Sequence, residues 1–97
     1  MVLPHPTNAI LVGKKPTMNY VIAALRMLTH EGLEEVVIKA RGTNVYRAVE
    51  TAEAIRRTMA NVVVKHVNIG SEEVVDKNRR RRRVSSIEIT LAKSKNF

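Results

Sequence analysis

The stretches VVVKHVNIGSEEVV (Val62–Val75) and VSSIEITLA (Val84–Ala92) stand on either side of the polar segment DKNRRRRR (Asp76–Arg83). Both flanking stretches are rich in β-branched residues, and the second alternates apolar with polar side chains, which is typical of a half-buried strand. Two consecutive strands joined by a short polar segment form an antiparallel hairpin. The sequence therefore predicts a long β-hairpin, with the five consecutive arginines Arg79–Arg83 at its tip.

The residues before this hairpin alternate between strand and helix signals. The apolar run Ala9–Val12 stops at Gly13 and predicts a short buried strand, and Glu35–Ala40 predicts a second one. Between them Lys14–Thr17 opens a helix, because proline fits the first helical turn, where its missing N–H leaves no hydrogen bond unmade. Gly32 is a natural stop for that helix.

A second helix is expected to run from the turn Arg41–Asn44 to about Met59. Thr43 or Asn44 is a suitable N-terminal cap for it. Apolar residues at helical spacing predict the inner face of each helix. For the first helix this face comprises Met18, Val21, Ile22, Leu25 and Leu28, and for the second Val45, Ala48, Val49, Ala52, Ile55 and Met59.

The predicted order of elements is β-α-β-α-β-β. Helices between successive strands imply right-handed crossovers, with both helices on one face of the sheet. The expected fold class is therefore α/β (α+β), a two-layer sandwich with a four-stranded mixed sheet and a long hairpin arm formed by the third and fourth strands. We expect a single domain over residues 1–97, with flexible tails at residues 1–8 and 94–97 and a mobile arginine-rich tip at residues 76–83.

Positive charge is in excess and is concentrated. The chain has 17 Lys and Arg against 9 Asp and Glu, a net charge of +8 and a pI near 10.5. Five of these 17 basic residues form the run Arg79–Arg83. Such a charge attracts polyanions, so a nucleic acid is the expected partner. The alternatives are a solvated loop or a membrane surface, but no amphipathic helix suited to a membrane accompanies the arginines.

The residue types needed for catalysis or metal binding are missing or scattered. There is no cysteine, which excludes disulfides, thiolate zinc sites and a cysteine nucleophile. His5, His30 and His66 lack the spacing of metal ligands, and Ser85 and Ser86 have no evident base. We therefore expect neither an enzyme nor a bound metal or cofactor. No apolar stretch reaches the ~20 residues that span a bilayer and the N-terminus does not read as a signal peptide, so the expected location is the cytoplasm.

Four segments of the chain are specific enough to compare with known families. They are ILVGKKPTMNYV (Ile10–Val21), VIKARG (Val37–Gly42), Ala48–Val49 and VSSIEI (Val84–Ile89). They resemble the Alba family of archaeal chromatin proteins, and the similarity extends over residues 8 to 93. The resemblance implies a fold like that of the C-terminal domain of a bacterial translation initiation factor and a two-fold homodimer. It also implies binding to double-stranded DNA and to RNA with little sequence preference, in association with the chromosome.

The resemblance also implies a modification and shows two departures. Family members can be acetylated on the lysine that matches Lys14, which weakens DNA binding, so an acetyltransferase and a deacetylase are implied partners. The five arginines of the tip replace a mixture of fewer basic residues with Gly, Gln and Asp in many members. Position 59 is Met, where many members have a Phe that helps dimers stack side by side on DNA. The resemblance therefore does not determine how dimers of this chain contact one another along a duplex.

Three groups of residues are candidates for contact with nucleic acid. Arg79–Arg83 lie on a β-ribbon, which can enter the minor groove or contact phosphates. Lys14 and Lys15 lie where a strand ends and a helix begins, and the N-terminus of that helix adds a partial positive charge. The third group comprises Arg41, Gly42, Thr43, Asn44 and Arg47. Because the first two strands are parallel, the loops that follow them should be neighbours and should merge Lys14, Lys15 and Arg41 into one surface.

Several candidates have a structural explanation beside the functional one. Thr43 and Asn44 are equally suitable as plain helix caps. Asn19 either bonds a phosphate or ties down the first turn of its helix. Tyr20 and Tyr46 could stack on bases, although an aromatic content of 3% provides no stacking platform.

The preferred hypothesis is an architectural chromatin protein that coats and compacts DNA as a dimer. We expect its subunits to pair through the second helix and the last two strands, burying Ile55, Ile87 and Ile89. The alternative is an RNA-binding protein, or a subunit of an RNA-processing particle, that uses the same surface. A nuclease would need a cluster of metal-binding carboxylates, which the sequence does not contain.

Overall fold

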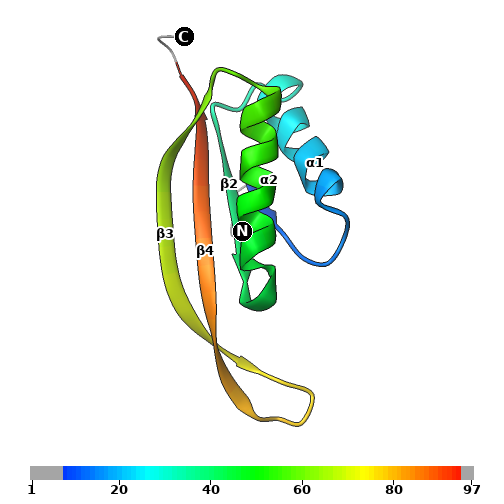
Figure 1. Cartoon of the computed structure of the whole chain (residues 1–97), viewed down its shortest axis with the longest axis vertical. Coiled ribbons are helices and arrows are strands. Elements are labelled where there is room, and N and C mark those ends of the chain that lie inside the picture. Colours follow the sequence, from blue (N-terminus) through cyan, green and yellow to red (C-terminus); the bar gives the residue numbers. More distant parts are fainter. Residues whose placement is uncertain (1–7, 95–97) are drawn as a thin grey trace, which may run out of the picture.

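The computed structural model describes residues 8–94. Its elements follow the predicted order, as Figure 1 shows. They are β1 (Ala9–Leu11), α1 (Thr17–Thr29), β2 (Glu35–Arg41), the 3₁₀ turn η1 (Gly42–Asn44), α2 (Val45–Thr58), β3 (Val62–Val75) and β4 (Arg81–Lys93). The tails predicted at residues 1–8 and 94–97 lie almost wholly outside the described residues.

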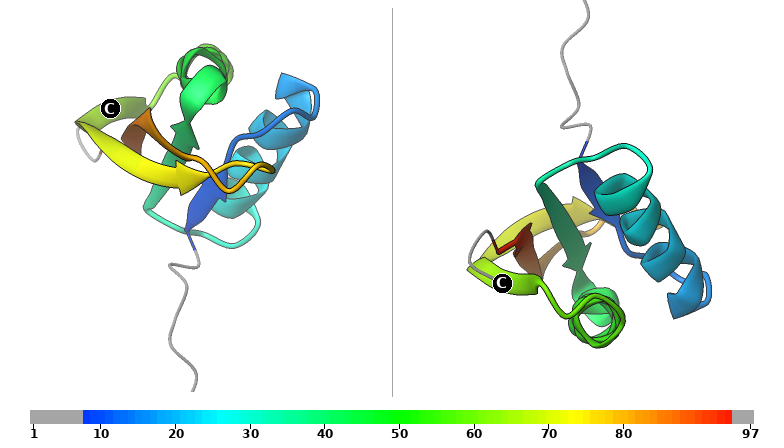
Figure 2. Two further views of the ribbon diagram at one scale, coloured as in Figure 1. Left: turned by 90° about the horizontal axis from the view of Figure 1, so that it is seen from below. Right: turned by 90° about the horizontal axis from the view of Figure 1, so that it is seen from above.

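The strands form one mixed sheet in the order β1-β2-β4-β3. β1 runs parallel to β2, with Leu11 opposite Lys39, whereas β4 is antiparallel to both β2 and β3. Figure 2 shows α1 and α2 on the same face of this sheet, and within residues 8–94 no helix covers the other face. The predicted fold class, with its four-stranded mixed sheet and long β3–β4 hairpin, is therefore confirmed.

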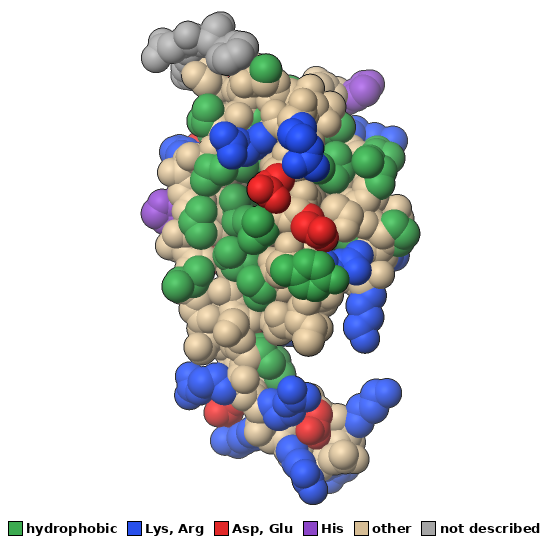
Figure 3. Space-filling model, in the orientation of Figure 1, with side chains coloured by type: hydrophobic (Ala, Val, Ile, Leu, Met, Phe, Trp, Pro, Cys, Tyr) green, Lys and Arg blue, Asp and Glu red, His purple; other side chains and the backbone are tan. Residues whose placement is uncertain are grey.

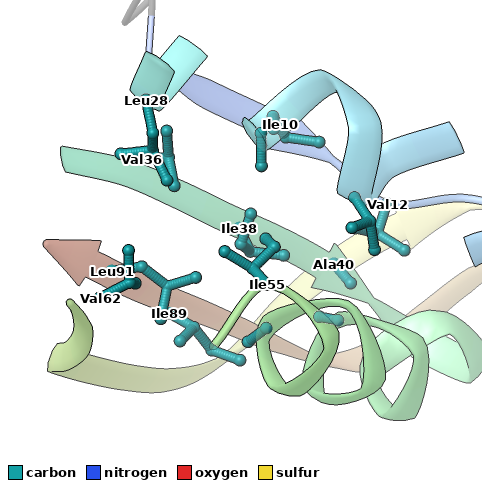
Figure 4. Close-up of a cluster of buried hydrophobic side chains, with 14 of the residues drawn as sticks. Ile10, Val12, Leu28, Val36, Ile38, Ala40, Ile55, Val62, Ile89 and Leu91 are labelled. Carbon is teal, nitrogen blue, oxygen red and sulfur yellow. The ribbon is translucent and has the colours of Figure 1, made fainter. Parts of the chain in front are cut away.

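The core lies between the two helices and the sheet (Figure 4). Alternate residues of β2 and β4 point toward the helices. The buried ones are Val36, Ile38, Ala40, Ile87, Ile89 and Leu91. Leu28 of α1 and Ile55 of α2 pack on this layer and are almost completely buried. Each such side chain contributes roughly 1.5–3 kcal/mol to folding, so this layer is the main stabilising contact of the chain.

The buried faces of the helices differ from the predicted ones. Met18 and Ile22 of α1 are 58% and 52% exposed, and Val49 of α2 is also exposed. The small residues Ala24 and Thr51 are fully buried instead. Thr51 tolerates burial because its hydroxyl donates to a backbone carbonyl one turn earlier, at 2.7 Å. Small side chains allow the helices to approach their neighbours closely, and a pattern of apolar residues alone does not register this effect.

The N-terminus of α2 is not capped as predicted, because no side chain makes a capping hydrogen bond at Asn44. The residues Gly42–Asn44 form a 3₁₀ turn, in which the N–H of Val45 donates to the carbonyl of Gly42. Gly42 has a φ of 62°, a left-handed conformation that glycine adopts without strain. The backbone therefore closes the connection between β2 and α2, and the explanation of Asn44 as a cap loses its support.

β3 has its predicted bounds, whereas β4 is longer and the turn is shorter than predicted. β4 begins at Arg81 rather than at Val84, so the turn comprises only Asp76–Arg80. The carboxylate of Asp76 accepts hydrogen bonds from two backbone N–H groups within this turn, at 2.8 and 2.9 Å. The arginines Arg81–Arg83 therefore extend a strand, while the mobility of residues 76–83 stays a prediction.

β3 leaves an apolar surface uncovered beside α2. Val64, Val67 and Ile69 stand opposite the buried apolar residues of β4 and share their face of the sheet. All three are exposed, Ile69 by 82%. Figure 3 shows hydrophobic side chains gathered along this side of the body. We call Val64, Val67 and Ile69 the β3 apolar patch.

The prediction that a partner subunit buries Ile55, Ile87 and Ile89 is wrong. Ile55, Ile87 and Ile89 are already buried within a single chain, where they form part of the core. The strand alternation that marked Ile87 and Ile89 as apolar correctly identified their face of the sheet, but that face is covered by the chain's own α2.

Candidate nucleic-acid interface

The connections that follow β1 and β2 lie side by side, as predicted for parallel strands. The N–H of Val12 donates to a carbonyl of β2 at 2.7 Å, which continues the pairing just beyond β1. Gly13, just after β1, and Arg41, the last residue of β2, line the same cleft. We call Gly13–Pro16 the lysine turn, because it presents the exposed side chains of two lysines.

Tyr20 fixes the backbone of the lysine turn. Its hydroxyl oxygen accepts hydrogen bonds from the N–H groups of Gly13, at 3.0 Å, and Lys15, at 3.1 Å. Its ring is half-buried and packs against the core. Sequence reasoning considered Tyr20 only as a group that stacks on bases and missed this role. The sequence does contain a signal for this role, because Tyr20 lies in the first turn of the helix that follows the lysines.

Arg47 braces the lysine turn from α2. Its Nη2 donates to the carbonyl of Lys15, and its buried Nε has no hydrogen-bond partner within residues 8–94. The sequence pattern predicted that Arg47 faces a phosphate backbone. In the structure its guanidinium donates to the protein's own main chain, and contact with a nucleic acid stays a prediction. Together, Tyr20 and Arg47 hold the turn from two helices, so Lys14 and Lys15 project from a fixed backbone.

The N-terminus of α1 lies beside the lysine turn and has no side-chain cap. Pro16 occupies the cap position, and the N–H of Asn19 donates to the carbonyl of Pro16 at 2.9 Å. The side chain of Asn19 is exposed and does not cap the helix, so one of its two predicted roles is unsupported. The positive end of the helix dipole therefore adds to the charges of Lys14 and Lys15.

An open cleft of about 510 Å³ lies between the lysine turn and the base of the hairpin arm. Residues from β1, β2, β3 and β4 line it, together with Asn44 at the start of α2. Gly42 lies against the base of the arm, where a Cβ added to it would be 3.9 Å from the Cβ of Val84. The third predicted group therefore connects the lysine turn with the arm.

Two ion pairs cross this cleft. The Nζ of Lys39 is 3.5 Å from the Oε2 of Glu88, and the Nη1 of Arg41 is 3.2 Å from the Oε1 of Glu72. Both pairs are partly exposed, so water and salt screen them. Arg41 thus already has an anionic partner within the chain, which the sequence pattern did not indicate.

The five arginines Arg79–Arg83 are all exposed. Arg82 points to the opposite face of the ribbon from Arg81 and Arg83, because side chains alternate along a strand. Arg81 has an acidic neighbour on β3, with its Nη1 3.6 Å from the Oε1 of Glu73. Figure 3 shows Lys and Arg side chains gathered over the arm, at the end of the molecule away from the chain's C-terminal end.

Within residues 8–94 no three His, Asp or Glu side chains are grouped so that they could hold a metal ion. In this part of the chain the nuclease hypothesis therefore lacks the carboxylate cluster that it needs. No helix of the same residues is long and apolar enough to cross a membrane.

These features define a class of small, strongly basic α+β proteins, in which cations gather at one end of the sheet and along a projecting hairpin. The chain belongs to the Alba family, whose model matches residues 8–73. The match ends on β3, so the arginine run lies beyond the matched residues. Membership of this family bears out the expectation that the chain is not an enzyme.

Individual relatives agree with this assignment. The chain is 47% identical over 85 residues to the DNA/RNA-binding protein Alba of Methanocella arvoryzae, an alignment that covers 87% of this chain and 88% of that protein. Alba from Thermoplasma volcanium superimposes with a TM-score of 0.81 at 38% identity, covering 89% of this chain and all of the other. ALBA1 from Trypanosoma brucei gives a TM-score of 0.69 at 26% identity, covering 96% of this chain and 76% of that one.

Proposed function

We propose that the chain binds double-stranded DNA and RNA with little sequence specificity, and that it coats and compacts DNA as an architectural chromatin protein. One observation supports this most strongly. The lysine turn, Arg41 and the arginine arm lie toward the same end of the sheet, where a single polyanion can meet all three. The name of the Methanocella relative, a DNA/RNA-binding protein, agrees with it.

The proposed contacts explain why specificity is low. Lys14, Lys15 and the arginines offer positive charge and N–H donors, which suit phosphate oxygens. Phosphates are the same at every step of a duplex, so such contacts give affinity without reading sequence. The arm is a two-stranded ribbon whose arginines project to both faces, which suits a groove with phosphates on either side.

The proposed unit is a homodimer. The residues of the β3 apolar patch and Val49 of α2 are exposed apolar side chains, which a second copy of the chain would bury. Burying apolar side chains of this size contributes roughly 1.5–3 kcal/mol each, and a two-fold contact counts each of them twice. A dimer would present the lysine turn and the arm twice, so one duplex can engage two arms.

Two further elements of the proposal concern regulation and location. Lys14 is exposed on the fixed lysine turn and is a suitable acceptor for an acetyltransferase, with a deacetylase to restore the charge. The protein is proposed to act in the cytoplasm, associated with the chromosome. Contacts between dimers on neighbouring sites would extend the coat along DNA.

The proposal is tested by equilibrium binding to several nucleic acids under one set of conditions. The probes are two DNA duplexes of equal length and unrelated sequence, and an RNA duplex of the same length. We expect the two DNA affinities to agree within about threefold, because phosphate contacts dominate. Compaction is measured on plasmid DNA by sedimentation. A preference of about 10³-fold for one DNA sequence, which is characteristic of direct base readout, would contradict the proposal.

RNA as the main cellular target is the second candidate function, since the relative's name includes RNA. The same basic surface would then serve as part of an RNA-processing particle. Competition between duplex DNA and structured RNA at equal salt separates the two candidates, because the preferred polymer displaces the other.

A further inference from the structure

Arg41 and Glu72 connect the body of the protein to the base of the arm. Their ion pair, at 3.2 Å, joins β2 to β3, although β4 lies between these strands. In the register of the sheet, Arg41 is opposite Ser86 and Ser86 is opposite Gly70. Glu72 is two residues further along β3, on the same face as Gly70. The pair therefore reaches diagonally across a whole strand.

Small residues on β3 and β4 leave space for the ion pair between Arg41 and Glu72. Gly70 has no side chain, and a Cβ added there would lie 3.3 Å from the Oγ of Ser86. Ser86 is small and Gly70 has no side chain, so at this point of the sheet the Arg41 side chain can reach across β4 to the carboxylate. Glu72 and Arg41 also line the open cleft, so both remain accessible to a ligand.

The carboxylate of Glu72 offers Arg41 the same kind of partner as a phosphate would. A guanidinium binds carboxylate and phosphate oxygens with the same planar set of N–H donors. Arg41 therefore has two alternative anionic partners, one within the chain and one on the proposed nucleic-acid ligand. Glu72 takes up the Nη1 of Arg41, so a phosphate that binds the paired Nη1 and Nη2 donors must displace this carboxylate.

We propose that Glu72 is an internal competitor for nucleic-acid phosphate. In the free protein it holds Arg41 and the base of the arm together. When a nucleic acid binds, a phosphate replaces Glu72 as the partner of Arg41. When the nucleic acid dissociates, the ion pair between Arg41 and Glu72 forms again. Glu72 thus limits affinity and speeds release, which keeps a coat of such proteins exchangeable. This inference rests on the proposed function, because it requires Arg41 to contact a nucleic acid.

The experiment is a double-mutant cycle between the two partners. Duplex DNA binding is measured by fluorescence anisotropy at about 50 mM salt, where exposed charges are weakly screened. The proteins are the wild type, Glu72→Gln, Arg41→Gln and the double variant. Glu31→Gln is the matched control, because it removes the same charge just beyond the C-terminal end of α1, remote from the arm. Circular dichroism checks that each variant is folded.

We expect Glu72→Gln to bind about 2- to 5-fold more tightly than the wild type and to dissociate more slowly, a modest effect typical of exposed ion pairs. Glu31→Gln should increase the affinity for DNA less than Glu72→Gln does. In the Arg41→Gln background the gain in affinity from Glu72→Gln should largely vanish, because the guanidinium for which Glu72 and phosphate compete is absent.

Two results would overturn the inference. An equal gain in both backgrounds would mean that Glu72 acts only by general repulsion of phosphates. No gain over Glu31→Gln would mean that Glu72 does not compete at all. Either result leaves the proposed function intact, whereas a wild type that binds no duplex at this salt overturns both.

Discussion

The hydroxyl oxygen of Tyr20 lies 3.0 Å from the amide nitrogen of Gly13 and accepts its hydrogen bond, so a side chain of α1 fixes the turn that precedes the helix. A Cβ added to Gly13 would lie 3.4 Å from that oxygen, which is ordinary van der Waals contact. The hydrogen bond, and not a lack of space, therefore couples Gly13 to the tyrosine seven residues later. Their contact sets the direction from which Lys14 and Lys15 reach a ligand.

Removal of this hydroxyl tests whether Tyr20 positions the lysines or stacks on bases. Tyr20→Phe keeps the ring and loses two hydrogen bonds, so it should lower the free energy of unfolding by about 1–3 kcal/mol. We expect DNA binding to weaken severalfold and hydrogen exchange at Gly13 and Lys15 to accelerate. Tyr46→Phe, which alters an exposed tyrosine on α2, is the control. Unchanged binding by Tyr20→Phe together with weak binding by Tyr20→Leu would favour stacking instead.

The β3 apolar patch is expected to hold the dimer together. Ile69→Ser removes an exposed apolar side chain from each subunit, so dimerisation should weaken by about 10²-fold while the monomer keeps its fold. Analytical ultracentrifugation over a range of concentrations measures this change. Met18→Ser, at an exposed apolar position on α1, should leave the dimer intact. If Met18→Ser dissociates the dimer and Ile69→Ser does not, the subunits pair through α1.

Ile55 should behave as a core residue of one chain. Ile55→Ala leaves a cavity between α2 and the sheet, and it should lower the free energy of unfolding by about 2–5 kcal/mol in urea. Under conditions in which Ile55→Ala is folded, the salt dependence of its DNA binding should match that of the wild type. A fully stable Ile55→Ala that fails to dimerise would return Ile55 to the subunit interface.

Loss of the charge on Lys14 imitates acetylation. Lys14→Gln removes one proposed phosphate contact per subunit, so affinity should fall severalfold and the salt dependence should become shallower. Lys14→Arg keeps the charge and should bind as the wild type does. Equal binding by Lys14→Gln and Lys14→Arg over the whole salt range would show that Lys14 touches no phosphate.

Much of the fold follows from local sequence patterns. The strand alternation in Ile87–Leu91, the glycine after α1 and the proline before it each have a local physical cause, and the structure has the elements that they predicted. The burial of Met18, Ile22 and Val49 was predicted wrongly, because it depends on which helix face approaches the sheet. That choice depends on small residues such as Ala24, whose contribution is not apolar area but close approach.

The candidate site was predictable as a set of cations but not as an arrangement. The positions of Lys14, Lys15 and Arg41 followed from parallel strands that end at one edge of a sheet. The roles of Tyr20 and Arg47 depend on hydrogen bonds between segments that the sequence separates, and the same holds for the pairing of Arg41 with Glu72. No spacing rule connects residues 31 positions apart across an intervening strand.

The central claim, that the arginine arm grips phosphates, is tested most directly by the salt dependence of DNA binding. Wild type is compared with a variant in which all five arginines of Arg79–Arg83 are replaced by glutamine. For a dimer that neutralises ~6–10 phosphates, affinity should fall ~10³- to 10⁵-fold between 50 and 200 mM salt, and the variant should give a clearly shallower slope. Equal slopes for the two proteins, or a wild-type affinity that ignores added salt, would contradict the account.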